Sequence, residues 1–241
     1  MEKLDRLWSD GYEFIFDDTL FQPSTDSFLL GAFPHLKRNM NVCDLGAGSG
    51  LLSLLLLARE PSLHVTNVEI QERACALAQR NAEKNQLTER ITVLQADLTQ
   101  PKELPTASTF DLIIANPPYF STDSGAVSAD SARRTARSEC ACTLDDLCAA
   151  AMRLLRSGGQ FCLVFRIERM VELLLALRTH RLEPKRLRFV QNKADSAPSL
   201  LLLEARKDGH EGLRIEPPLI LRTVDGQETD ELKRIYFKDK E

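Results

Sequence analysis

The sequence lacks a long hydrophobic run, which excludes a membrane-spanning helix of ordinary length. Its longest apolar stretch, residues 51–58, is far shorter than the roughly 20 residues needed to cross a bilayer. The first residues, among them Glu2, Lys3 and Asp5, carry charges of both signs and lead into no signal-peptide core. The sequence therefore predicts a cytoplasmic protein that does not enter a membrane.

Patterns of metal ligands are also scarce. There are only four histidines, and they lie nowhere near a pair of cysteines. Of the six cysteines, only Cys140 and Cys142 are close in sequence, and their spacing differs from that of zinc knuckles and thioredoxin motifs. We therefore expect no bound metal, and thiols that are reduced and mostly buried.

The chain contains no internal repeat and no low-complexity tract. Its formal net charge of −4 argues against indiscriminate nucleic-acid binding but leaves room for a local basic face. A length of 241 residues suits one large domain with a modest appendage. We expect a lead-in over residues 1–38, a main domain over 39–206 and a loosely packed tail over 207–241, in a monomer.

A predicted strand, a glycine-rich turn and a predicted helix follow one another between residues 41 and 58. The apolar run 41–45 is typical of a buried strand, and the next five residues include Gly46, Gly48 and Gly50. Glycines permit tight turning and close approach of the backbone to a ligand. The spacing differs from the G-x-G-x-x-G of pyrophosphate-binding turns, and Asp44 precedes the turn. A carboxylate there suits a cationic or amino-bearing ligand better than a phosphate.

Two further predicted strands end in acidic residues. Residues 64–68 are followed by Glu69, and residues 91–95 are followed closely by Asp97. A carboxylate at the second strand tip can accept hydrogen bonds from both hydroxyls of a ribose, and the third could meet an adenine amino group. Any one of these carboxylates is more often a solvated strand end. Three carboxylates at the ends of successive predicted strands, together with the glycine turn, indicate a nucleoside-binding site.

A four-residue sequence, Asn116-Pro117-Pro118-Tyr119, follows the apolar run 110–115, which suits a strand buried on both faces. The prolines end that strand because neither can donate a backbone hydrogen bond. The asparagine amide and a proline-fixed carbonyl can accept the hydrogens of a planar amino group, with Tyr119 stacked on its face. Phe120 is a second stacking candidate. A proline-capped strand end with a core tyrosine is the alternative interpretation.

A helix start is predicted near residue 24, after a lead-in with an amphipathic start and a weakly alternating stretch at 12–16. Pro23 is followed by Ser24, Thr25 and Asp26 and then by an apolar run. The free N–H groups and hydroxyls at such a start can receive a ligand carboxylate, which places Thr25 or Asp26 near it. A plain helix N-cap is the alternative.

Positive charge is concentrated in two places. Residues 161–193 carry eight basic and three acidic side chains, a local excess of five. For the helical members of this group we prefer a solvated charged face. Arg133, Arg134 and Arg137 lie in a long polar stretch, residues 120–142, just after the Asn-Pro-Pro-Tyr sequence. We interpret these three as contacts to a substrate.

These features within alternating strands and helices resemble the class I methyltransferases that use S-adenosylmethionine. The chain is similar over nearly its whole length to the tRNA1(Val) (adenine-37-N6)-methyltransferase family. The resemblance implies an α/β fold with a Rossmann-like, seven-stranded sheet that is mostly parallel, has a C-terminal antiparallel strand and carries helices on both faces. Ser138 stands where members of that family tend to have histidine.

The resemblance also implies an activity and residue roles. The reaction is methylation of an adenine N6 amine in RNA, foremost a tRNA, with S-adenosylmethionine as cofactor and without a metal. The implied cofactor-binding residues are Thr25, Asp26, Asp44, Gly46, Gly48, Gly50, Glu69, Asp97 and Asn116. The implied catalytic residues are Asn116, Pro117, Pro118 and Tyr119, and the implied substrate contacts are Tyr119, Phe120, Arg133, Arg134 and Arg137.

Other functions stay open at this point. A protein-glutamine N5-methyltransferase would use the same chemistry, but such enzymes generally carry a helical substrate domain ahead of the fold. A DNA adenine methyltransferase would usually need an added target-recognition region, and a nicotinamide dehydrogenase is disfavoured by the glycine spacing and by Asp44. A non-catalytic cofactor-binding or RNA-binding module is a further alternative.

Overall fold

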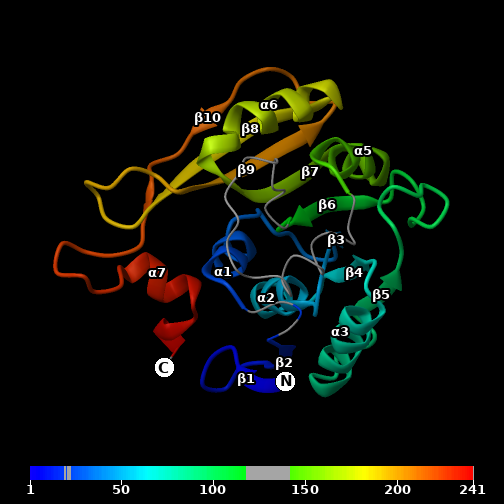
Figure 1. Ribbon diagram of the computed structural model, residues 1–241, viewed down its shortest axis with the longest axis horizontal. Helices are drawn as coiled ribbons and strands as arrows, with labels where there is room; N and C mark the ends of the chain where they lie inside the picture. Colours follow the sequence, from blue (N-terminus) through cyan, green and yellow to red (C-terminus); the bar gives the residue numbers. More distant parts are fainter. Residues whose placement is uncertain (19, 21–22, 118–141, 241) are drawn as a thin grey trace, which may run out of the picture.

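A nine-stranded sheet forms the centre of the protein (Figure 1). The computed structural model describes residues 1–18, 20, 23–117 and 142–240. The strands lie in the order β10-β8-β9-β7-β6-β3-β4-β5, and β11 also pairs with β8. The five parallel strands at one side of the sheet are β3 (Asn41–Leu45), β4 (His64–Glu69), β5 (Ile91–Gln95), β6 (Phe110–Ala115) and β7 (Leu155–Arg166).

One strand runs against the others, in agreement with the fold that the resemblance implied. β9 (Leu200–Lys207) lies between β7 and β8 (Leu182–Gln191) and is antiparallel to both. Two strands were not expected: β10 (Arg214–Ile215) and β11 (Leu219–Ile220) have two residues each and pair parallel with β8. The seven expected strands are therefore present, and the C-terminal segment adds two short ones beside β8.

Helices cover both faces of the sheet because alternate strand residues point to opposite sides. Leu112 and Ile114 belong to one hydrophobic core, and Ile113 and Ala115 belong to the other. The first core is covered by α1 (Thr25–Ala32), α2 (Leu51–Arg59) and α7 (Asp230–Ile235). The second is covered by α5 (Leu144–Leu154) and α6 (Met170–Thr179), whereas α3 (Glu72–Lys84) contacts β4, β5 and β2.

Two 3-10 helices complete the described elements: η1 (Ile167–Arg169), ahead of α6, and η2 (Lys238–Lys240), after α7. None of the helices within the described ranges is both long and apolar enough to span a bilayer.

The lead-in is an antiparallel hairpin of β1 (Glu2–Arg6) and β2 (Glu13–Asp17). The outer edge of β2 is paired by two amide side chains of α3. The Asn81 amide accepts from the Ile15 nitrogen at 2.7 Å and donates to the Ile15 carbonyl at 2.9 Å, and Asn85 binds Glu13 in the same way. These bonds satisfy backbone groups that an edge strand would otherwise leave free.

The tail is anchored in the core at four places, although many of its other residues, such as Ile215 and Val224, are exposed. Leu219, Leu232, Ile235 and Phe237 are all buried in the core beneath α1 and α2. The Phe237 ring lies 4.6 Å from that of Trp8 and 4.4 Å from the Arg59 guanidinium carbon, so residues near both chain ends meet. The apolar residues of the tail are spaced singly, and tertiary packing gives them a shared face that local sequence does not reveal.

Candidate active site

Three predicted site residues, Asp44, Glu69 and Asn116, lie along one edge of the sheet, where neighbouring parallel strands end. β4 ends at Glu69, Asn116 directly follows β6, and Asp44 is the penultimate residue of β3. The register places Asp44 beside Asn67 of β4 and Ile114 of β6. Residues far apart in sequence are thus brought together at the carboxyl ends of the strands, where open α/β sheets bind their ligands.

The glycine turn between β3 and α2 has a backbone that few residues other than glycine adopt. Gly46 and Gly48 have φ angles of +75° and +55°. A Cβ atom built on either would meet nothing within 4 Å, so the space beside the turn is open. Glycine is therefore favoured here by the backbone conformation, and the open space can admit a ligand.

Asp44 is fully buried next to this turn, and among the described residues neither of its carboxylate oxygens has a hydrogen-bond partner. Burial, and then the charge of Glu69, raise the pKa of Asp44 from 3.8 to about 8. A buried carboxyl group without donors is costly, and it becomes favourable when a ligand brings an N–H group or a positive charge. This observation supports the prediction that Asp44 faces an amino-bearing ligand.

Glu69 is 7% exposed and supports the turn from the end of β4. Its Oε2 accepts from the Gly48 nitrogen at 2.8 Å, and its Oε1 accepts from the nitrogens of Ile70 and Gln71 at 3.0 and 2.9 Å. A carboxylate offers about four acceptor positions, so one on Oε2 is left for a ligand hydroxyl. The carboxylate therefore combines a structural contact with a capacity to bind a ribose.

Replacing Glu69 tests this assignment. We expect Glu69→Gln and Glu69→Ala to weaken S-adenosylhomocysteine binding by roughly 10- to 100-fold, because each removes charge-assisted hydrogen bonds. Glu72→Ala, at the exposed start of α3, is the matched control and should leave the affinity unchanged. Isothermal titration measures all three variants, and wild-type affinity in Glu69→Ala would exclude a contact to the ribose.

Asn116 extends from the end of β6 towards the start of α1. Its Nδ2 donates a hydrogen bond of 3.1 Å to the Oγ of Ser27, which is 1% exposed. The amide oxygen has no hydrogen-bond partner among the described residues, so it can accept from a target group. Ser27 was not among the predicted site residues, and only its place two residues after Thr25 could have suggested it.

Three predicted cofactor contacts have partners of their own within the protein. The Thr25 hydroxyl, at the first residue of α1, accepts from the Tyr236 hydroxyl at 3.0 Å. Asp26 follows it in the first turn and is half-buried. The Asp97 Oδ1 accepts from both the nitrogen and the hydroxyl of Thr99 at 2.8 Å. The predicted start of α1 is thus confirmed, and the roles of Thr25, Asp26 and Asp97 towards a ligand stay predictions.

Several predicted residues cannot be placed. Pro117 is described and buried. Seven others of interest lie outside the described residues: Pro118, Tyr119, Phe120, Arg133, Arg134, Arg137 and Ser138. Their proposed contacts to a substrate therefore stay predictions.

Many arginines of the basic stretch, residues 161–193, are paired with carboxylates, some within the stretch and some elsewhere in the chain. Arg186 is buried and binds Glu204 at 3.0 Å, while Arg188 makes two bonds of 2.6 and 2.9 Å to Glu231. Other pairs in this group include Arg169–Glu172, Arg178–Glu183 and Arg181–Asp208. Arg186 and Arg188 therefore tie β8 to other segments, and the solvated face preferred for the helical residues stays a prediction.

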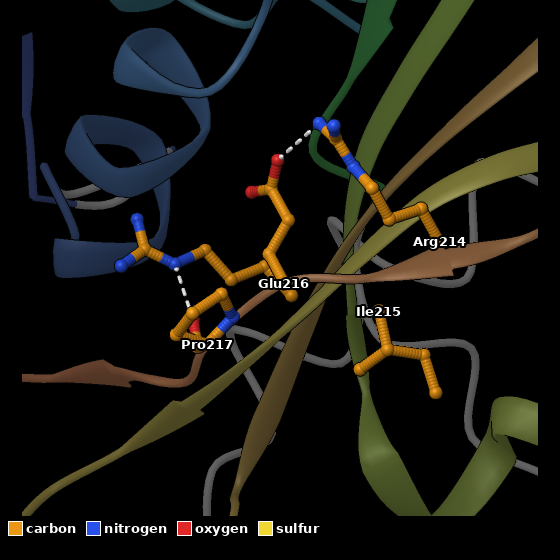
Figure 2. Close-up of a pocket in the computed structure, with 5 residues that line it drawn as sticks. Arg214, Ile215, Glu216 and Pro217 are labelled. Atoms are coloured by element: carbon orange, nitrogen blue, oxygen red, sulfur yellow. Dashed lines mark hydrogen bonds and ion pairs between the residues drawn. The ribbon is translucent and has the colours of Figure 1, made fainter.

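A cavity of about 420 Å³ lies beside β8 and β10, lined by Arg188, Arg214, Ile215, Glu216 and Pro217 (Figure 2). Arg214 pairs with Glu216 at 3.1 Å, and Arg188 Nε donates to the Pro217 carbonyl at 3.0 Å. β9, β7 and β6 separate these strands from β3. Both arginines are already engaged, and the cavity is remote from the glycine turn, so we place the active site at the strand ends instead.

Solved structures share the fold of this chain. A predicted O-methyltransferase from Agrobacterium tumefaciens matches with a TM-score of 0.74 and 22% identity, over 88% of this chain and 96% of that one. Precorrin-6y C5,15-methyltransferase from Geobacter metallireducens matches with a TM-score of 0.57 and 16% identity, over 80% and 94%. At these identities the likeness shows the fold alone, which is the α/β fold of class I methyltransferases.

The family follows from sequence comparison. The model of the methyltransferase small domain family matches residues 23–184, and the chain belongs to that family. Two similar proteins are the tRNA1(Val) (adenine(37)-N6)-methyltransferases of Parabacteroides distasonis and Shewanella halifaxensis. They are 33% and 34% identical over 189 and 199 residues, which is 78% and 80% of this chain and the same shares of theirs.

Proposed function

We propose that this enzyme methylates the N6 amine of an adenine in a tRNA, at a position of the adenine-37 type. The observation that carries the proposal is the Asn116 amide, whose nitrogen is bound to Ser27 and whose oxygen faces no partner among the described residues. An acceptor at the end of β6, beside the glycine turn, suits a target that presents amino hydrogens. The names of the relatives from Parabacteroides and Shewanella support adenine in tRNA as that target.

The residues at the strand ends fit the cofactor. S-adenosylmethionine supplies an activated methyl group when it is bound. Asp44, with two unpartnered buried oxygens, would receive the amino-acid end of the cofactor together with Thr25 or Asp26. The remaining acceptor position of Glu69 would take the ribose, and Asp97 would take the adenine amino group.

The chain contributes to the reaction mainly by orientation. Asn116 Oδ1 and the Pro117 carbonyl would accept the two hydrogens of the target amine, which turns its lone pair towards the methyl group. The same acceptors stabilise the positive charge that develops on the nitrogen. Tyr119, or Phe120, would stack on the extruded base. A strong general base is unnecessary, because the product proton leaves to water once the nitrogen–carbon bond has formed.

The RNA is proposed to approach over the residues that follow the Asn-Pro-Pro-Tyr sequence. Arg133, Arg134 and Arg137 would contact phosphates there, since most arginines of the 161–193 stretch are paired with carboxylates. We further propose that the enzyme acts as a monomer in the cytoplasm and requires no metal.

A labelling experiment tests the choice of substrate. Purified protein is incubated with methyl-labelled S-adenosylmethionine and, separately, with total tRNA, total DNA or a release factor, and products are digested to nucleosides or amino acids. We expect label in N6-methyladenosine from tRNA only, and far less of it with Asn116→Ala. Label that appears only in glutamine would contradict the proposal and indicate a protein-glutamine methyltransferase.

A further inference from the structure

Ser27, on α1, holds the side chain of Asn116 through a hydrogen bond. An amide has a donor end and an acceptor end of nearly the same size and shape, and its hydrogen-bond partners determine which end points where. The Ser27 hydroxyl lies 3.1 Å from Nδ2 of Asn116 and is buried. With the nitrogen bound there, the oxygen is the free end.

We propose that Ser27 is a positioning residue that keeps the acceptor oxygen of Asn116 directed at the target amine. This role rests on the proposed function only in requiring an amine as the target, whether adenine N6 or a glutamine side chain. A serine hydroxyl can bond either end of an amide, so Ser27 fixes the place of the Asn116 side chain, while the amino hydrogens of the target, which need an acceptor, select its oxygen. Productive binding therefore depends on a residue that does not itself touch the substrate.

Ser27 lies on α1, and residues from the C-terminal half of the chain contact both ends of this helix. At its start, the Tyr236 ring stacks on Phe28 at 4.4 Å with an interplanar angle of 16°. At its end, Arg186 Nη2 donates to the Phe33 carbonyl at 2.6 Å, and its guanidinium carbon lies 3.9 Å from the Phe33 ring centroid. A rigid support of this kind is what a residue needs in order to fix the orientation of another.

The amide resonances of the side chain give a test that does not depend on activity. In a ¹⁵N-labelled protein, the side-chain NH2 pair that is missing in Asn116→Ala belongs to Asn116. We expect this pair to shift in Ser27→Ala, which has no acceptor, and to stay near its wild-type position in Ser27→Thr, which keeps the hydroxyl. An unchanged pair in Ser27→Ala would overturn the proposal whatever the substrate is.

A double-mutant cycle tests the consequence for catalysis on whichever amine-bearing substrate accepts the label. Single-turnover rates should fall by about 10- to 100-fold in Ser27→Ala, because a misplaced catalytic group costs about that much. The dissociation constant of S-adenosylhomocysteine should stay within about twofold. In an Asn116→Ala background, Ser27→Ala should have no further effect on the rate, since the group that it positions is gone.

The control for loss of a buried hydroxyl is Ser53→Ala. Ser53, on α2, is also buried and donates a hydrogen bond to an asparagine side chain, Asn67 of β4. Its effect, whatever its size, should add to that of Asn116→Ala. Additive effects of Ser27→Ala and Asn116→Ala would mean that Ser27 only packs α1, and would overturn the proposal. Failure of the proposed function has a different signature: label in glutamine, with the coupling between Ser27 and Asn116 intact.

Discussion

Asn116→Ala should lower the single-turnover rate of methyl transfer by about 100- to 1,000-fold, the loss typical of removing one preorganised group that stabilises developing charge. The affinity for S-adenosylhomocysteine should change by less than about threefold, because the interaction that is lost is made to the target amine. The measurement combines rapid-quench kinetics, with enzyme in excess over labelled substrate, and isothermal titration.

Stability should be little affected by this substitution. The only hydrogen bond of the Asn116 side chain among the described residues is the one to Ser27, so the free energy of unfolding should change by about 1 kcal/mol. Asn41→Ala is the matched control, because Asn41 is exposed at the opposite end of β3. If Asn116→Ala kept wild-type rates, the strand-end corner would have no catalytic role and a non-catalytic module would become the better description.

Asp44→Asn should change how stability depends on pH. The pKa of Asp44 is about 8 in the folded protein and about 3.9 in an unfolded chain. Between these values the folded state keeps a proton that the unfolded state has lost, so the free energy of unfolding falls as the pH rises from about 4 to about 8. An asparagine at this position does not titrate, so the free energy of unfolding of Asp44→Asn should not fall in this way as the pH rises.

We expect the difference in melting temperature between Asp44→Asn and the wild-type protein to increase with pH. The two proteins should melt similarly near pH 5, and Asp44→Asn should melt several degrees higher at pH 9, since each kcal/mol corresponds to about 2–4 °C in a protein of this size. Saturating S-adenosylhomocysteine should narrow the gap, because its amino group gives the Asp44 carboxylate a partner. Parallel melting curves from pH 5 to pH 9 would mean that Asp44 is already ionised and satisfied in the ligand-free protein.

Local sequence was informative where function depends on residues near strand ends. The apolar runs predicted the parallel strands, and Asp44, Glu69 and Asn116 follow them at the same edge because parallel strands share a direction. The antiparallel direction of a C-terminal strand came from the resemblance alone, since a short apolar run does not indicate its direction, and the position of β9 between β7 and β8 was not predicted. Ser27 could not be predicted, because its contact joins residues 89 positions apart.

Ion pairs between distant segments could not be predicted from the sequence either. The basic excess of residues 161–193 indicates a charged surface when it is counted locally. In the folded protein, Glu204, Glu216 and Glu231 come from other segments and pair with Arg186 and Arg188. Charge that appears unbalanced along the chain is therefore balanced in space, and only the cluster of Arg133, Arg134 and Arg137 stays a predicted RNA contact.

A crystal structure with bound S-adenosylhomocysteine would test the proposed active site most directly. We predict that the ligand lies between the glycine turn and the end of β6. Its ribose should bind Glu69, its amino group should lie near Asp44, and its sulfur should face Asn116. A ligand found in the cavity beside β8 and β10, or bound with its sulfur directed away from Asn116, would contradict it.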